Sequence, residues 1–252
     1  MSSQEDKVGS APKVLTFGTM LLRNQPSGDP ELVNLWYKLR KEYHKEQCLI
    51  IDAHSPEVLL SRLRFEYDYS VLPADEVCIE VTIPKVQRLI VMSHPSNVGH
   101  YAAKCGGVDG WGRAMVQGLQ IALDNGFEYA VHVETDCVLK RSALELVKEL
   151  SRSGKPFGCP MRKRRNEPEP NVMVFDLRSK RAGEFARWYK WQEASRGEGK
   201  ILEFWRDDWH QLQLVGGREE DGELDPRGVD FITHTTIAKA MEAAQHITGE
   251  NQ

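Results

Sequence analysis

The sequence predicts a three-layer α/β/α domain built on a mostly parallel central sheet flanked by helices. Apolar segments of strand length alternate along the chain with segments whose apolar residues recur at helical spacing. Such alternation is typical of a parallel sheet with helices packed on its faces. Hydrophobic residues make up 40% of the chain and charged residues 28%, which agrees with a soluble globular protein.

The first half of the chain alternates strand and helix. Asp29-Pro30-Glu31 supplies a capping acid, a proline for the first helical position and an acid for the first turn, so it predicts a helix start. Ser55-Pro56-Glu57 predicts a second start of the same kind. Residues 64–87 show no clear pattern except a short strand expected at 77–83. The other strands expected here are residues 13–20, 47–51 and 88–92.

The chain is organised around residues 109–139. Apolar residues from Trp111 to Leu123 recur at about 3.6-residue spacing and predict a helix buried on one face. Asp109 can cap its start, and Asn125-Gly126 supplies a left-handed residue that ends it. A mostly apolar segment at 129–134 then predicts a strand that is covered on both faces.

Glu134-Thr135-Asp136, at the end of that strand, is the strongest candidate site. Strand ends of this kind lie at the edge where open α/β sheets bind ligands. Two acidic side chains two positions apart can approach one divalent cation, and Mg²⁺ or Mn²⁺ prefers such oxygen ligands while keeping room for substrate phosphates. The alternative is a pair of ordinary solvated acids.

The second half is expected to continue the same architecture. Ser142 and Glu145 have the spacing of a capping box, which predicts a helix to about Arg152. Further helices are expected at 180–193, 201–214 and 236–246, strands at 156–159, 171–177 and 231–235, and a loop at 215–229.

Composition gives no sign of a membrane-spanning, secreted or nucleic-acid-binding protein. No apolar run approaches the ~20 residues that a membrane span needs. Residues 1–12 are polar and are expected to be a disordered lead rather than a signal peptide. The five cysteines lack paired spacing, which favours a reducing compartment and a cytoplasmic protein. The net charge of -4 provides no general attraction to nucleic acid or anionic membranes.

Four short motifs in order resemble the GT-A fold of nucleotide-diphospho-sugar transferases, and glycosyltransferase family 2 in particular. They are Asp52-x-x-Ser55, Asn97-x-Gly99, Gly112-Arg113-Ala114 and Glu134-x-Asp136. The resemblance covers residues 13–140 well and the remainder only in general layout. It implies a Rossmann-like single domain over 13–247, with a nucleotide-sugar-binding half at 13–140 and an acceptor-side half at 141–247.

The resemblance implies an enzyme that transfers a sugar from a nucleotide-diphosphate sugar to an acceptor hydroxyl. The enzyme class expected is that of the hexosyltransferases. An inverting reaction with Mn²⁺ or Mg²⁺ is expected. A cation that bridges both phosphates offsets the charge that builds on the leaving group. The acceptor stays open among glycans, small molecules, proteins and nucleic acids.

The resemblance also assigns roles to individual residues. Thr19 and Asp52 would line the pocket for base and ribose, and Arg113, at a helix start, would oppose the phosphates. Asp136 would be the main metal ligand, while Glu134 would contact the metal, the ribose or water. His234 would complete the metal or diphosphate site, although a lone histidine beside apolar residues is also a common structural residue.

Inverting transfer needs a general base, for which the sequence offers several acids. Asp208, expected on a helix, is the first choice and Asp221 the second; Asp230 is a further candidate. For each, a solvated surface acid is the alternative.

Two other functions remain open. A sugar-phosphate nucleotidyltransferase of related fold would use the same acids, although residues 18–23 lack the repeated glycines expected there. The second possibility is a non-catalytic nucleotide-sugar-binding or scaffold protein. It stays open because the first acid of the metal motif is Glu134 rather than an aspartate, and because no residue stands out as the general base.

Overall fold

The computed structural model describes residues 11–24, 28–71, 89–94, 110–162, 167–188, 201, 203–218, 225–226 and 228–249. Three features expected from the sequence lie outside these ranges: residues 1–10 of the N-terminal lead, the strand at 77–83 and the Asn97-x-Gly99 motif. No helix in the described ranges is both long enough and apolar enough to cross a membrane.

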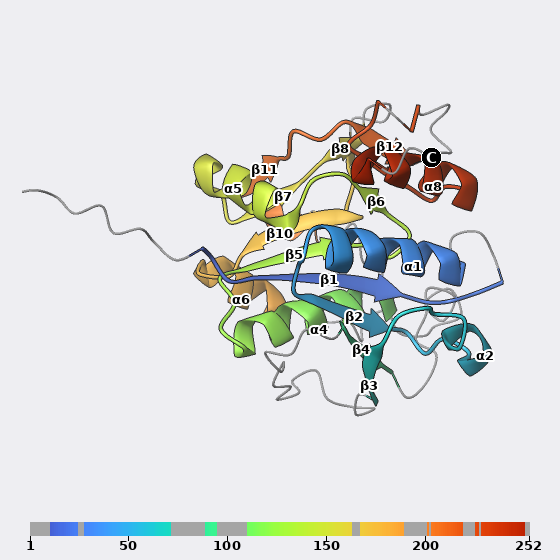
Figure 1. Ribbon diagram of the computed structural model, residues 1–252. Helices are drawn as coiled ribbons and strands as arrows, with labels where there is room; N and C mark the ends of the chain where they lie inside the picture. The colour runs from blue at the N-terminus through green and yellow to red at the C-terminus, as the bar shows by residue number, and fades with distance from the viewer. Residues whose placement is uncertain are drawn as a thin grey trace, which may run out of the picture.

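An eight-stranded sheet forms the centre, in the order β11-β7-β10-β5-β1-β2-β4-β3 (Figure 1). All its neighbouring strands pair in parallel except β10, which is antiparallel to both β5 and β7. Its strands are β1 (Val14–Met20), β2 (Cys48–Asp52), β3 (Tyr67–Val71), β4 (Leu89–Ser93), β5 (Tyr129–Val133), β7 (Phe157–Cys159), β10 (Val172–Asp176) and β11 (Trp209–Gln211). The predicted mixed α/β class with a mostly parallel sheet is confirmed.

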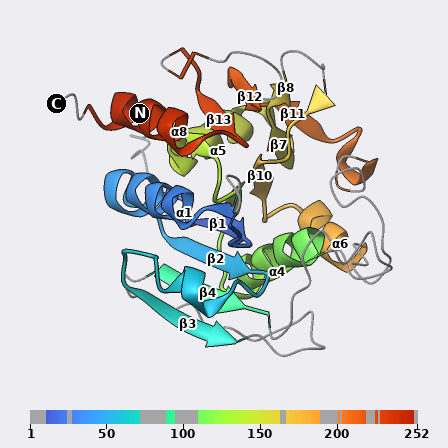
Figure 2. The same ribbon diagram turned by 90° about the vertical axis from the view of Figure 1, so that its right-hand side faces the viewer.

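Helices cover both faces of the sheet, as Figure 2 shows with α1 on one side and α4 and α6 on the other. One face packs against α4 (Gly110–Asp124) and α6 (Lys180–Trp188), and the opposite face against α1 (Pro30–Tyr37), α2 (Glu57–Leu60) and α5 (Ala143–Ser153). The wider π-helical turn η2 (Lys38–Tyr43) continues α1, and α8 (Ile237–Thr248) packs outside it. Alternate residues of each buried strand belong to opposite cores, which is why the strands are apolar throughout.

Two smaller sheets flank the main one. The strands β6 (Val138–Leu139), β12 (Gly216–Arg218) and β13 (Phe231–Thr233) form one of them, and β8 (Met161–Arg162) pairs with β9 (Glu167–Pro168) in the other. The first matters for function, because β6 follows the Glu134–Asp136 turn and β12 and β13 bring distant parts of the chain beside it.

The predicted starts of α1 and α5 are confirmed, whereas α2 begins differently: Pro56 takes the N-cap position without a side-chain hydrogen bond, and the Ser55 hydroxyl donates to Asp52 instead. Asp29 accepts a hydrogen bond from the Glu31 backbone at 2.9 Å and caps α1. Ser142 and Glu145 form the expected capping box, and Gly154 ends α5 in a left-handed conformation. Thr236 caps α8.

Two predictions in the second half are wrong. Residues 201–214 are not one helix, because Trp209–Gln211 instead pairs with β7 as the edge strand β11. The loop expected at 215–229 contains strand β12, which pairs with β13. Backbone pairing between segments distant in sequence decided both cases, and local periodicity does not reveal such pairing.

Candidate active site

A cavity of about 280 Å³ opens where β1 and β5 end. The chain passes from β1 to β2 and β4 on one side and then returns to place β5 on the other side of β1. This reversal of strand order is the place where open α/β sheets bind ligands. The cavity is lined by Thr19, Met20, Leu21, Leu22, Arg23, Gly28, Asp29, Leu32, Val33, Ala53, Trp111, Ala114, Glu134, Thr135, Asp136, Arg218 and His234.

The turn after β5 is fixed tightly to the end of β1. The Thr135 hydroxyl donates to the Thr19 carbonyl at 2.9 Å, and the Cys137 amide donates to the Glu134 carbonyl at 2.9 Å. Gly18 permits this approach, since a Cβ there would lie 2.8 Å from Cγ2 of Thr135. The turn therefore presents Glu134 and Asp136 to the cavity from a rigid backbone.

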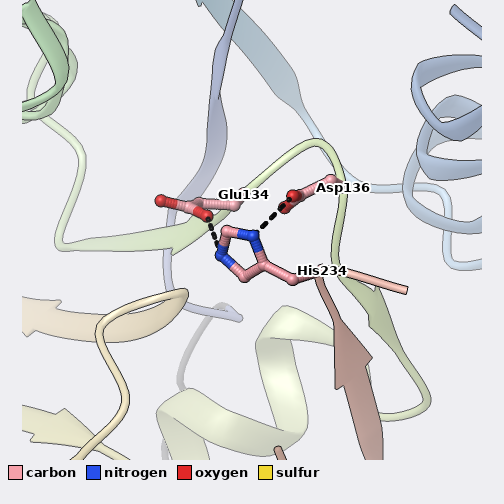
Figure 3. A group of neighbouring side chains, drawn as sticks. All are labelled: Glu134, Asp136 and His234. Carbon is pink, nitrogen blue, oxygen red and sulfur yellow. Dashed lines mark ion pairs between the residues drawn. The ribbon is translucent and has the colours of Figure 1, made fainter. Parts of the chain in front are cut away.

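His234 reaches the two carboxylates from the other half of the chain, directly after β13. Its imidazole lies between them, with Nδ1 3.6 Å from Oδ2 of Asp136 and Nε2 4.0 Å from Oε2 of Glu134 (Figure 3). The backbone of His234 has a φ of 49°, a left-handed conformation that is uncommon for residues other than glycine. Such strain is typical of functional positions and here aims the ring into the cavity.

The three residues fit a divalent cation. One ligand atom from each lies within 4.8 Å of the others. Ligands bound to one Mn²⁺- or Mg²⁺-sized ion at about 2.1 Å span at most about 4.2 Å, so only a small side-chain movement separates the triad from coordination. Carboxylate oxygens and an imidazole nitrogen are an appropriate donor set for such an ion.

Burial makes this corner of the cavity unfavourable for bare negative charge. Desolvation raises the pKa of Asp136, while His234, the Thr233 hydroxyl and Arg218 act in the opposite direction. Oε1 of Glu134 accepts a hydrogen bond from Nε1 of Trp111 at 2.5 Å. A bound cation would provide the charge compensation that the carboxylates need.

Arg218 of β12 adds a positive charge to the wall of the cavity. Its guanidinium makes two contacts of 3.1 and 3.2 Å with the carboxylate of Glu169, which is fully buried. The bidentate pair fixes the arginine side chain, whose exposed fraction is 18%.

Two residues expected to bind the nucleotide are buried instead of lining the cavity. The Asp52 carboxylate is fully buried and accepts hydrogen bonds from Ser55 and Ser93, so it fixes the ends of β2 and β4. Desolvation raises its pKa and the serine hydrogen bonds lower it. Its neighbour Ala53 lines the cavity, as does Thr19. Arg113 is buried within α4, 3% exposed, and the cavity instead meets Trp111 and Ala114 of that helix.

The structure does not bring Asp208 to this site. In the strand register, its neighbour Trp209 aligns through β7 and β10 with Ala130, near the amino end of β5. The cavity lies at the carboxyl end of that strand, so Asp208 is at the opposite end of the strands. Asp208 is 46% exposed and lies 3.5 Å from Arg181, as the alternative of a surface acid predicts. Asp221 lies outside the described residues and stays a prediction.

Several cavity and supporting residues were not found from the sequence: Trp111, Asn171, Arg218 and Thr233. Trp111 was read only as part of a buried helix face. Asn171 had a weak signal, as the polar residue before an apolar strand, and Thr233 as the residue before His234. Arg218 was hidden in a segment read as a loop.

Comparison with known proteins gives matches among solved structures, whereas no family model and no curated protein matches. The galactosyltransferase LgtC, solved with donor and acceptor sugar analogs, matches with a TM-score of 0.48 and 8% identity over 92% of this chain and 95% of that one. A glycosyltransferase involved in glycosylation of the major capsid of PBCV-1 matches with a TM-score of 0.48 and 10% identity over 93% and 99%. A putative glucose-1-phosphate thymidylyltransferase from Bacillus anthracis matches with a TM-score of 0.48 and 12% identity over 96% and 97%.

The matching structures thus include nucleotide-diphospho-sugar glycosyltransferases, the proteins that the sequence motifs resemble. The similarity concerns the fold only, with TM-scores of 0.43 to 0.48 for five of the matching structures. What the chain does must therefore be inferred from its own site.

Proposed function

We propose that the protein is a divalent-metal-dependent glycosyltransferase that moves a sugar from a nucleotide-diphosphate sugar to an acceptor hydroxyl. The observation that carries the proposal is the convergence of Glu134, Asp136 and His234 in one cavity at the reversal of strand order. In the reaction, the bond between the anomeric carbon and the donor phosphate breaks, and a bond to the acceptor oxygen forms. Two negative phosphates are left together, and this is the charge that a cation at the triad would offset.

The rest of the cavity supports a nucleotide donor. Met20, Leu22 and Leu32 give it an apolar portion that suits a flat base, and Arg218 stands near Asp136 with charge for a phosphate. We assign donor binding mainly to residues 13–140 and the acceptor side to 141–247. His234 and Arg218 make the second half a contributor to the diphosphate region as well.

The ligand set favours Mn²⁺ over Mg²⁺. Magnesium strongly prefers oxygen ligands, whereas an imidazole nitrogen is better accommodated by a transition metal. Inverting transfer further requires a base opposite the leaving group. Asp221 and Asp230, whose carboxylate accepts a hydrogen bond from the Val215 amide at 2.9 Å, stay candidates for that role.

The test is release of nucleoside diphosphate from a panel of UDP-, GDP-, ADP- and dTDP-sugars in the presence of Mn²⁺. Release from one donor, stopped by a chelator and by Asp136→Ala, is expected. Asp124→Ala is the matched control, because Asp124 is an acid at the far end of α4 that contacts Gln120. Pyrophosphate release from a nucleoside triphosphate and a sugar 1-phosphate would instead indicate a nucleotidyltransferase. Donor binding without turnover would indicate a binding protein.

A further inference from the structure

A buried asparagine lies behind the triad, contacts Glu134 and His234 directly and reaches Asp136 through Thr233. Asn171, just before β10, is 1% exposed. Its Nδ2 lies 2.5 Å from Oε2 of Glu134 and 3.3 Å from Nε2 of His234. The same atom lies 2.8 Å from the hydroxyl of Thr233. The backbone carbonyl of Asn171 also accepts the Glu134 amide at 2.9 Å.

The direction of these hydrogen bonds follows from the number of hydrogens available. An amide nitrogen carries two hydrogens, and the two shorter contacts, to Glu134 and Thr233, use both. The Thr233 hydroxyl has one hydrogen, which it donates to Oδ1 of Asp136 at 3.3 Å. Asn171 therefore donates directly to the Glu134 carboxylate. By donating to the Thr233 hydroxyl, it also directs the hydrogen of that hydroxyl to the Asp136 carboxylate.

The orientation of the amide is fixed by the same contacts. Turning it over would place Oδ1 at 2.5 Å from a carboxylate oxygen of Glu134, where two acceptors repel each other. In the observed orientation Oδ1 is buried and has no hydrogen-bond partner among the described residues. Packing alone does not account for a buried amide with one unsatisfied atom, since an apolar side chain would avoid that cost.

We propose that Asn171 is a positioning residue of the cation site. It holds the Glu134 carboxylate directly and the Asp136 carboxylate through Thr233, so that only a small movement brings both into coordination when the ion binds. The inference rests on the proposed function, because it presupposes that the triad binds a divalent cation. Partners of this kind behind metal ligands typically change metal affinity about 10- to 100-fold when removed.

The experiment measures Mn²⁺ affinity from the electron paramagnetic resonance signal of free Mn²⁺. It compares the wild type with Asn171→Ala, Thr233→Val and Thr233→Ser. Asn125→Ala is the matched control, because Asn125 donates to the Ile121 carbonyl at the end of α4, away from the site. We expect about a tenfold or greater loss of affinity for Asn171→Ala and Thr233→Val. Thr233→Ser keeps the hydroxyl and should bind Mn²⁺ about as tightly as the wild type. The control Asn125→Ala should also keep the affinity of the wild type.

The outcomes separate the two proposals. If the wild type binds no Mn²⁺, the proposed cation site fails and this inference fails with it. If the wild type binds but Asn171→Ala binds equally well, only the role of Asn171 is overturned. Should Asn171→Ala fail to fold, equal affinities of Thr233→Val and Thr233→Ser would overturn it as well, because a purely structural role does not depend on the hydroxyl.

Discussion

Asp136→Asn should stabilise the protein without metal and destabilise it relative to wild type with metal. The substitution keeps the shape of the side chain and the acceptor for Thr233 but removes one of two charges whose ligand atoms lie within 4.8 Å. At that separation the repulsion is about 1 kcal/mol in water and about 3.5 kcal/mol at an effective dielectric constant of 20. Attraction to His234 opposes this repulsion, so we expect a net gain of about 1 kcal/mol, or roughly 2–4 °C in melting temperature.

Manganese should reverse the order of stability. A ligand at one hundred times its Kd stabilises the folded state by about 2.7 kcal/mol, so the wild type gains that amount and Asp136→Asn gains almost nothing. Melting curves with and without Mn²⁺ measure the crossing, with Asp124→Asn as a control that should follow the wild type in both conditions. A variant that melts below the wild type without metal would show that the two carboxylates do not destabilise each other, and an equal gain from Mn²⁺ would show that Asp136 is not a metal ligand.

The same carboxylate gives a pH dependence of known sign. Desolvation raises the pKa of Asp136 in the folded state, against the opposing effects of His234, Thr233 and Arg218. An acid with a raised pKa stabilises the fold at low pH, and this contribution is lost as the pH rises from the unfolded value of about 3.9 through the folded-state value. Metal-free wild type should therefore lose stability relative to Asp136→Asn as the pH increases above about 4.

Three further substitutions separate structural from functional residues. His234→Ala should weaken Mn²⁺ binding by at least about tenfold in titration calorimetry while the circular dichroism spectrum stays unchanged. Asp52→Ala should lower the free energy of unfolding by about 1–3 kcal/mol in urea titrations, because it removes the buried carboxylate that accepts hydrogen bonds from Ser55 and Ser93, yet leave Mn²⁺ affinity intact. A selective loss of ligand binding would restore Asp52 to the nucleotide site. Gly118→Ala should cost about 1–3 kcal/mol, since its Cβ would lie 2.3 Å from the ring of Phe17, and unchanged stability would contradict the packing of α4 on β1.

The first half of the fold was predictable because its signals are local. Caps such as Asp29 and buried strands such as β1 and β2 follow from short stretches of sequence. The antiparallel β10 and the edge strand β11 depend on pairing with distant segments. Periodicity of a single segment carries no information about its partner, and so the segment around Trp209 was misread as a helix.

The candidate site was predictable to a similar extent. Glu134 and Asp136 are predictable because they directly follow a strand end, and His234 because the resemblance implies a late histidine in the metal or diphosphate site. The resemblance assigns Asp52 and Arg113 to the nucleotide, whereas the fold buries both side chains. Asn171 acts through contacts that exist only after three strands meet, and no local pattern could have assigned it.

On the proposed function, Glu134, Asp136 and His234 bind a cation for a nucleotide-sugar donor. The most direct measurement is a thermal-shift screen of UDP-, GDP-, ADP-, CMP- and dTDP-sugars, each with Mn²⁺ and with a chelator. We expect one nucleotide class to raise the melting temperature, only with Mn²⁺, and His234→Ala to abolish the rise. No rise with any donor, or an equal rise in the presence of the chelator, would contradict it.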